Sequence, residues 1–161
     1  SRSNVAFCES LGCYDQVLTY DMIADTPAAY LEPAASLVYV DFAGNAALRR
    51  SIHANFANLK YSCSIGGTHV THLGSGKDLA GVKPVLFFAP AQVKKRMEDW
   101  GGAEFGRQMF MAWAGFIKTV TTSNPPWLQT QYHQGVSEVS KVYTEVLAGK
   151  GSPRIGHMLS I

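Results

Sequence analysis

The stretch Ser36-Leu-Val-Tyr-Val-Asp-Phe-Ala-Gly-Asn45, with the residues that follow it to Gly67, carries the clearest pattern of secondary structure in the chain. Residues 37–40 form a short β-branched and aromatic run without charge, which is typical of a strand buried on both faces of a parallel sheet. A glycine turn breaks this run, and Asn45 is suited to cap the helix that follows. Residues 59–63 then read as a second strand that ends in a second glycine turn. The stretch therefore predicts strand, glycine turn, helix, strand and glycine turn.

The predicted helix between these two strands has one apolar side. Leu48, Ile52 and Phe56 lie four residues apart, so they share one face of a helix. The charged and polar neighbours fall outside this stripe, and we expect them on the exposed side: Arg49, Arg50 and His53.

The rest of the chain continues to alternate between the two kinds of element. Strands are predicted over residues 16–20, 85–88, 127–132 and 155–161, and helices over residues 4–11, 91–100, 103–120 and 136–148. A single helical turn is expected at residues 21–24, and a long loop at residues 68–83. The alternation predicts an α/β fold, partial and Rossmann-like, with a mostly parallel sheet and flanking helices. No internal boundary is visible, so we expect one domain over residues 1–161.

Two helices carry stripes that predict core positions. In the long helix the stripe consists of Phe105, Met109, Trp113, Phe116 and Val120, and in the last helix of Val139, Val142, Tyr143 and Val146. Such spacing marks the side of a helix that faces the core.

Composition limits the classes of partner. The chain has 161 residues, of which 47% are hydrophobic and 16% charged, and its formal net charge is +2. This argues for a globular chain and against nucleic acid or an anionic membrane as partner. Cys8, Cys13 and Cys63 are odd in number and lack metal-type spacing, which predicts reduced thiols, a cytoplasmic location and no metal site.

A few residues are candidates for chemistry. Asp41 ends the central strand, where it is either a catalytic base or a cap for the turn. His69 and His72 are either metal ligands or a substrate-facing or hydrogen-bonded pair on the loop. Arg2 is either a phosphate-binding guanidinium or a solvated terminal side chain. Ligands of open α/β sheets lie at the carboxyl ends of the strands, which directs attention to the two glycine turns.

Four stretches together resemble a known family: residues 4–21, 38–47, 61–69 and 143–161. They include Leu11-Gly12, the run from Asp41 to Gly44, and Ile65-Gly-Gly-Thr-His69. The chain resembles the cofactor-binding half of the medium-chain dehydrogenase/reductase superfamily, of the quinone-reductase type. It looks closest to the branch known as the DUF2855 family, and the similarity covers almost the whole chain.

The resemblance implies a set of cofactor-binding residues. Positions that match the NADP 2′-phosphate site are Ser1 and Tyr20; the usual basic residue is replaced by Asn4, so that role falls to Arg2 or is lost. The turns that match the nicotinamide and ribose site consist of Phe42, Ala43 and Gly44, and of Gly66 and Gly67, while Phe87 and Phe88 border the nicotinamide. The resemblance names no catalytic proton donor, and His69 or His72 on the long loop is the candidate that the sequence offers.

The family pattern is present only in part. Its glycine-rich pyrophosphate turn, its first strand and its N-terminal substrate domain would precede Ser1. We therefore expect an incomplete dinucleotide-binding domain with a C-terminal family extension, which binds NADP weakly or not at all by itself. Bare sheet edges would favour either self-association or a missing N-terminal segment as the complement.

Two functions follow as expectations. The first is the C-terminal portion of an NADP(H)-dependent oxidoreductase that transfers hydride from the cofactor to a small-molecule substrate, an activated C=C or a quinone-like acceptor. The alternative is a non-redox module of the same fold that has lost the cofactor. Such a module would bind a small apolar ligand, act as a cyclase or isomerase, or serve as a dimerisation unit.

Overall fold

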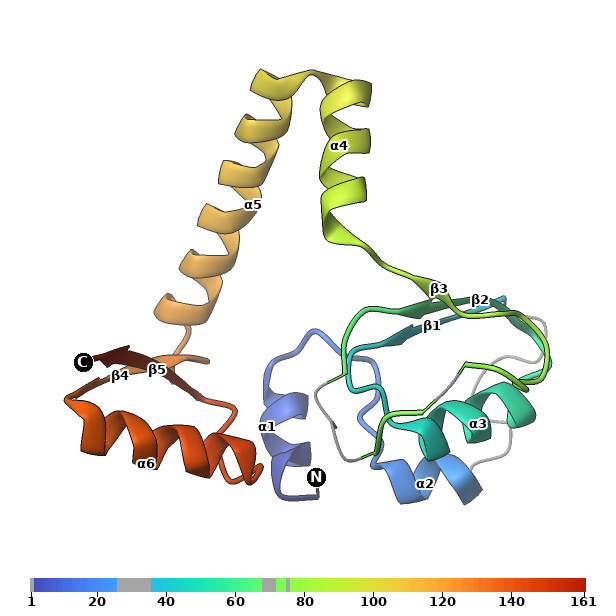
Figure 1. The fold of residues 1–161 in the computed structure, drawn as a ribbon, viewed down its shortest axis with the longest axis horizontal. Coiled ribbons are helices and arrows are strands. Elements are labelled where there is room, and N and C mark those ends of the chain that lie inside the picture. Colours follow the sequence, from blue (N-terminus) through green and yellow to red (C-terminus); the bar gives the residue numbers. More distant parts are fainter. Residues whose placement is uncertain (1, 26–35, 68–71, 75) are drawn as a thin grey trace. The chain divides into compact units, whose positions relative to one another are not determined.

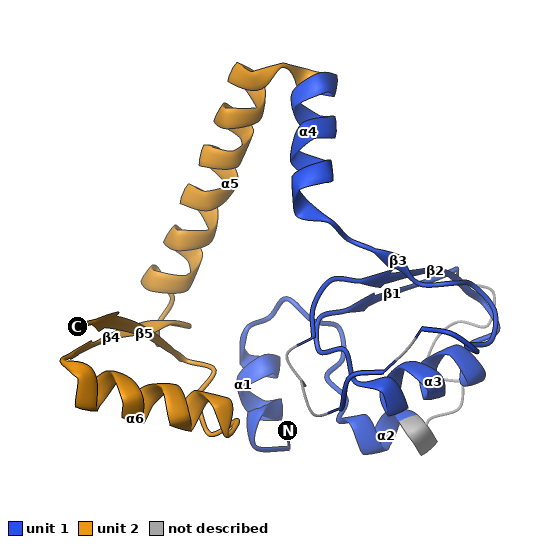
Figure 2. Ribbon diagram, viewed as in Figure 1, with its two compact units in different colours: residues 1–99 blue, residues 100–161 orange. Residues whose placement is uncertain are grey.

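The structure is a computed structural model that describes residues 2–25, 36–67, 72–74 and 76–161. The chain forms two compact units, Ser1–Asp99 and Trp100–Ile161 (Figure 2). All described strand pairs in both units are parallel, and a helix connects β1 to β2 and another connects β4 to β5, which confirms the predicted α/β class. The expectation of one domain over residues 1–161 stays a prediction.

The first unit is built on a three-stranded sheet. Its strands are β1 (Leu37–Asp41), β2 (Leu59–Ser64) and β3 (Val85–Leu86), in the order β1-β2-β3. Val38 lies opposite Tyr61, and all pairs are parallel. The helix α3 (Ala46–Asn55) connects β1 to β2 (Figure 1). The carboxyl ends of the three strands therefore meet at one edge of the sheet, as the sequence predicts.

The N-terminal part differs from the prediction at one strand. It consists of η1 (Arg2–Asn4), α1 (Val5–Ser10) and α2 (Tyr20–Asp25), and Gly12 follows α1 with a φ of +66°. The predicted strand over residues 16–20 is wrong, because residues 16–19 have no regular structure and residue 20 begins α2. A strand needs a neighbour for its backbone groups, and the described strands pair only with one another.

The prediction that β1 is buried on both faces is also wrong. Tyr39 and Asp41 turn toward α3, whereas Val38 and Val40 on the other face are 62% and 43% exposed. This alternation follows the two-residue period of a strand. One face is open because α3 covers only the opposite one.

The helix α4 (Ala89–Trp100) begins two residues earlier than predicted and follows β3. The second unit then contains α5 (Gly102–Thr122), β4 (Gln129–Gln134), α6 (Val136–Leu147) and β5 (Ile155–Ser160). The strands β4 and β5 pair in parallel over six residues, and α6 connects them and packs on both. The predicted order of helices and strands in this part is confirmed.

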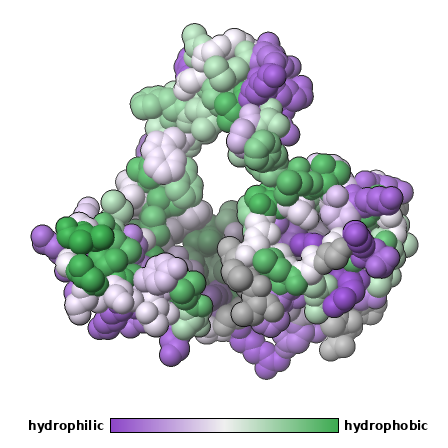
Figure 3. Space-filling model, viewed as in Figure 1, coloured by the Kyte–Doolittle hydropathy of each residue, from purple (hydrophilic) through white to green (hydrophobic). Residues whose placement is uncertain are grey.

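The predicted core stripes are only partly correct. On α5 Val120 is buried, but Met109, Trp113 and Phe116 are exposed, and Figure 3 shows apolar side chains along this helix. On α6 Val142 is buried. The remaining predicted core residues of α6 are half-buried or exposed: Val139, Tyr143 and Val146. Helical spacing identifies an apolar face, but it does not supply the element that covers that face.

Within the part of the chain that the structure describes, no helix has both the length and the apolar character required to span a bilayer.

Candidate nucleotide-binding edge

The two glycine turns touch at the carboxyl edge of the first sheet. The backbone N–H groups of Ile65 and Gly66 donate to the carbonyl of Asp41, over 2.9 and 3.2 Å. A Cβ atom at Gly66 would lie 2.5 Å from the carbonyl oxygen of Phe42. Gly44 has a φ of +74°, which residues other than glycine rarely adopt. Both turns therefore need glycine in order to pack against each other.

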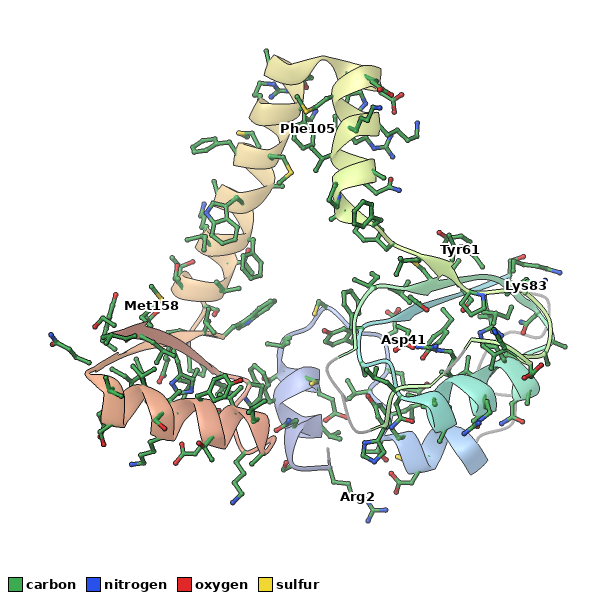
Figure 4. The ribbon with its side chains drawn as sticks, viewed as in Figure 1. Arg2, Asp41, Tyr61, Lys83, Phe105 and Met158 are labelled. Atoms are coloured by element: carbon green, nitrogen blue, oxygen red, sulfur yellow. The ribbon has the colours of Figure 1, made fainter. Side chains whose placement is uncertain are left out.

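Asp41 holds the first turn in place. Its Oδ1 accepts from the backbone N–H of Gly44 over 2.8 Å, and its Oδ2 accepts from Nε and Nη2 of Arg49 over 2.9 and 2.7 Å. Both side chains are buried, and Figure 4 shows Asp41 between the sheet and α3. A carboxylate with three donors is well satisfied as an anion. Of the two roles predicted for Asp41, the structure therefore supports the turn cap.

Arg49 and His53 correct the prediction for α3, because both are buried rather than exposed. The Nδ1 atom of His53 lies 2.9 Å from the carbonyl oxygen of Ala80, and Nε2 lies 2.9 Å from the Ser62 hydroxyl. Since a carbonyl only accepts, Nδ1 carries the proton and Nε2 accepts from Ser62. Arg49 and His53 are four residues apart, so they share one face of α3, next to the apolar stripe. This spacing is the sequence signal that could have predicted that both side chains are buried.

Asn45 caps the start of α3, as predicted. Its Oδ1 atom accepts from the backbone N–H of Leu48 over 2.9 Å, which satisfies one of the donors that a helix start leaves open. The cap fixes the path of the chain from the first glycine turn into α3.

Exposed aromatic rings flank the glycine turns. Phe42 follows β1, and Phe87 and Phe88 follow β3; all three are exposed, Phe42 by 63%. The Phe87 backbone N–H donates to the carbonyl of Ser64 over 2.9 Å, which extends the sheet to this point. Because β2 lies between the two strands, Phe42 and the Phe87-Phe88 pair stand roughly 10 Å apart. Ala43 is half-buried beside them.

The long loop covers part of this edge. A methyl carbon of Leu73 lies 2.6 and 2.8 Å from where Cβ atoms of Gly44 and Gly67 would stand, so it packs directly on both turns. At Gly74 a Cβ atom would lie 2.5 Å from the side chain of Ala46, the first residue of α3. His72 precedes Leu73 and is exposed, and it is therefore brought to the edge. His69 lies outside the described residues.

Two of the residues predicted to bind the 2′-phosphate, Arg2 and Tyr20, lie in η1 and at the first position of α2. Arg2 makes an ion pair with Asp21, a partner that the sequence analysis missed, and both side chains are exposed. Thr19 and then Arg2 lower the pKa of Asp21 to about 2. Tyr20 is 44% exposed, and its pKa is raised first by burial and then by the charge of Asp41. Arg2 is thus paired with the residue that follows Tyr20 in the chain, while Ser1 lies outside the described residues.

Two further observations concern proton donors and metal ligands near this edge. Burial, followed by the charge of Asp41, raises the pKa of Tyr39 far above its ordinary value, so this phenol is a poor proton donor. Within the described ranges no three His, Cys, Asp or Glu side chains converge in a way that could hold a metal ion.

Parallel strands that end together in glycine turns with exposed aromatic rings define a Rossmann-like α/β protein. Residues 1–152 match the family described as a protein of unknown function, DUF2855, and the chain belongs to this family. No curated protein and no solved structure matches the chain.

Proposed function

We propose that the chain is the C-terminal portion of an NADP(H)-dependent oxidoreductase of the medium-chain reductase type. The complete enzyme would transfer a hydride to an activated C=C or a quinone-like acceptor. One observation carries the proposal: three parallel strands end at one edge, in two touching glycine turns flanked by exposed phenylalanines. Ligands of open α/β sheets bind at such an edge.

The side chains at the edge suit the nicotinamide half of the cofactor. A planar, weakly polar ring fits beside Phe42 or Phe88, whose faces are free to stack on it. Leu73 occupies part of the same space and must move before a ring can reach Gly44 and Gly67. When bound, the nicotinamide would supply the hydride, and the protein would position it and exclude water.

Arg2 and Tyr20 would hold the 2′-phosphate. Arg2 offers a planar set of donors and Tyr20 a hydroxyl, and both groups suit a phosphate monoester. Asp21 now neutralises Arg2, so a phosphate has to replace the Asp21 carboxylate on the guanidinium. Because Asp21 competes with the phosphate for Arg2, we expect the chain alone to bind NADP weakly.

His72 is the proton donor that the geometry favours among the described residues. It precedes Leu73, which contacts both glycine turns, so His72 is held near the place where a substrate would meet the cofactor. An imidazole exchanges protons near neutral pH, which suits this role.

The test is a fluorescence titration of the purified chain with NADPH and NADH. We expect weak NADPH binding, and we expect Arg2→Ala to weaken NADPH far more than NADH. The matched control is Lys141→Ala, which removes an exposed charge on α6 and leaves both affinities unchanged. Equal effects of Arg2→Ala on the two cofactors would remove the phosphate assignment.

A second candidate function has its own supporting observation. A cavity of about 290 Å³ lies between α2, β1 and α3. It is lined by Leu18, Ile23, Leu37, Val38, Tyr39, Ile52, Phe56 and Leu59. A cavity of this kind suits a small apolar ligand and favours a non-redox module, for which the exposed stripe on α5 would add an interaction surface. Tight NADPH binding in the titration would exclude this alternative.

A further inference from the structure

A pair of histidines joins the two strands of the second unit. His133 is on β4 and His157 on β5, and Nε2 of His133 lies 2.9 Å from Nδ1 of His157. The ring centroids are 5.0 Å apart. Only 17% of the His133 side chain is exposed. One ring must donate and the other accept, so this bond exists only while at least one facing nitrogen lacks a proton.

The pair joins two strands that have no third strand beside them among the described residues. In the described part of the chain, the second sheet consists of β4 and β5 alone. In the register of these strands His157 faces Gln131, and His133 faces Leu159. Two-stranded sheets depend strongly on their side-chain contacts. The histidine bond therefore adds a side-chain link to the backbone bonds and to the packing of α6 that hold β4 to β5.

The charged groups around the pair come from α6, which packs on both strands. Oε2 of Glu138 lies 4.0 Å from Nδ1 of His133, and 56% of the Glu138 side chain is exposed. The other ionisable groups of α6 are the exposed Lys141, Tyr143 and Glu145, while Val142 is buried against the strands. The strands themselves add Tyr132, which is 81% exposed. Glu138 is thus the anion placed to offset a charge on His133.

The number of protons on the two histidines decides whether their rings attract or repel each other. With one extra proton, the His133 imidazolium donates from Nε2 to neutral His157 and turns its other N–H toward Glu138. With two extra protons, two N–H groups face each other across 2.9 Å with no acceptor between them. Glu138 can offset only one of the two charges, and the like charges repel.

We propose that the His133–His157 pair is a pH-sensitive latch, which joins β4 to β5 while at least one ring is neutral and releases them when both rings are charged. When the strands separate, each ring can take up its own proton without facing another N–H group. Since the separated state can hold more protons than the paired state, the strand pairing weakens as the pH falls. This device is independent of any cofactor.

The test is amide hydrogen exchange by NMR on the full chain at pH 7.5 and pH 5.0, with rates normalised to those of unstructured amides. In the wild type we expect protection of the β4 and β5 amides to fall roughly tenfold or more at pH 5.0. Amides of β1 and β2 report acid effects elsewhere in the chain. In His157→Gln, and likewise in His133→Gln, one charge remains, and the change should stay within about twofold.

Either of two results would overturn the latch. One is wild-type protection in β4 and β5 that changes less than twofold between the two pH values. The other is a loss of protection in β4 and β5 at pH 5.0 that is as large in both glutamine variants as in the wild type. The first result is obtained from the wild type alone, so it decides the matter even where a variant does not fold.

Discussion

At the scale of single residues, a buried ion pair holds the first glycine turn. Asp41 accepts two bonds from Arg49 and one from the backbone of Gly44, and little of either side chain reaches water. Pairs of this kind are costly to break from one side, because the remaining charge stays buried without a partner.

We therefore expect Arg49→Ala to lower the free energy of unfolding by about 3–5 kcal/mol. Arg50→Ala, one residue further on and exposed, should change it by less than about 0.5 kcal/mol. Urea unfolding followed by circular dichroism compares the two variants. Equal small losses would show that the bond between Asp41 and Arg49 does not hold the turn.

Glycine at the contact between the two turns gives a second prediction. Gly66→Ala places a methyl group 2.5 Å from a backbone oxygen, and the backbone must shift to accept it. We expect a loss of about 1–3 kcal/mol in the free energy of unfolding. Gly106→Ala, in α5 with open space around it, should instead be neutral or stabilise by up to about 1 kcal/mol. A harmless Gly66→Ala would mean that the turns do not touch.

At the scale of elements, the start of α3 depends on its cap. Asn45→Ala removes the acceptor for the Leu48 backbone N–H, and we expect a loss of about 1 kcal/mol in the free energy of unfolding. Asn55→Ala is the control, because Asn55 ends the same helix and makes an exposed bond to Ser51. In thermal unfolding, the midpoint temperature should therefore decrease more for Asn45→Ala than for Asn55→Ala.

The loop over the glycine turns should oppose cofactor binding. Leu73→Ala removes the side chain that packs on Gly44 and Gly67, so a nicotinamide would no longer displace it. Leu73 is already 52% exposed, so we expect a gain of about 1 kcal/mol, roughly fivefold in NADPH affinity. Leu147→Ala, on the exposed surface of α6, should leave the affinity unchanged in the same titration. A weaker affinity for Leu73→Ala would mean that this side chain contacts the cofactor instead.

The sequence predicts elements well where local chemistry decides them. The cap at Asn45, the glycine that follows α1 and the parallel direction of β1 and β2 are all visible in the order of residues. The strand predicted over residues 16–20 is absent, although the segment contains Val17, Thr19 and Tyr20, which suit a strand. The prediction fails because a strand is stable only beside a partner, which is a property of the sheet and not of the segment.

At the scale of the whole molecule, burial was the least predictable feature. The stripe on α5 shows the correct helical period, yet Trp113 and Phe116 are exposed. Conversely, Arg49 and His53 are polar and were expected outside, but each meets a matching partner in the interior. Polarity alone predicts exposure only when no buried partner exists, and such partners come from residues distant in sequence.

The candidate site could be predicted only in outline. The two glycine turns and the phenylalanines lie at one edge because the strands are parallel, and that follows from the βαβ pattern. The roles of Leu73 and Asp21 could not be read from the sequence, because they depend on how a loop and a short helix fold back onto that edge.

NMR with labelled amides can decide whether the carboxyl edge of the first sheet binds a dinucleotide, because it detects even millimolar binding. On addition of NADPH, we predict that amide signals shift at residues 42–44, 65–67 and 87–88, while those of β4 and β5 stay in place. An unchanged spectrum at millimolar NADPH, or shifts confined to the second unit, would contradict dinucleotide binding at this edge.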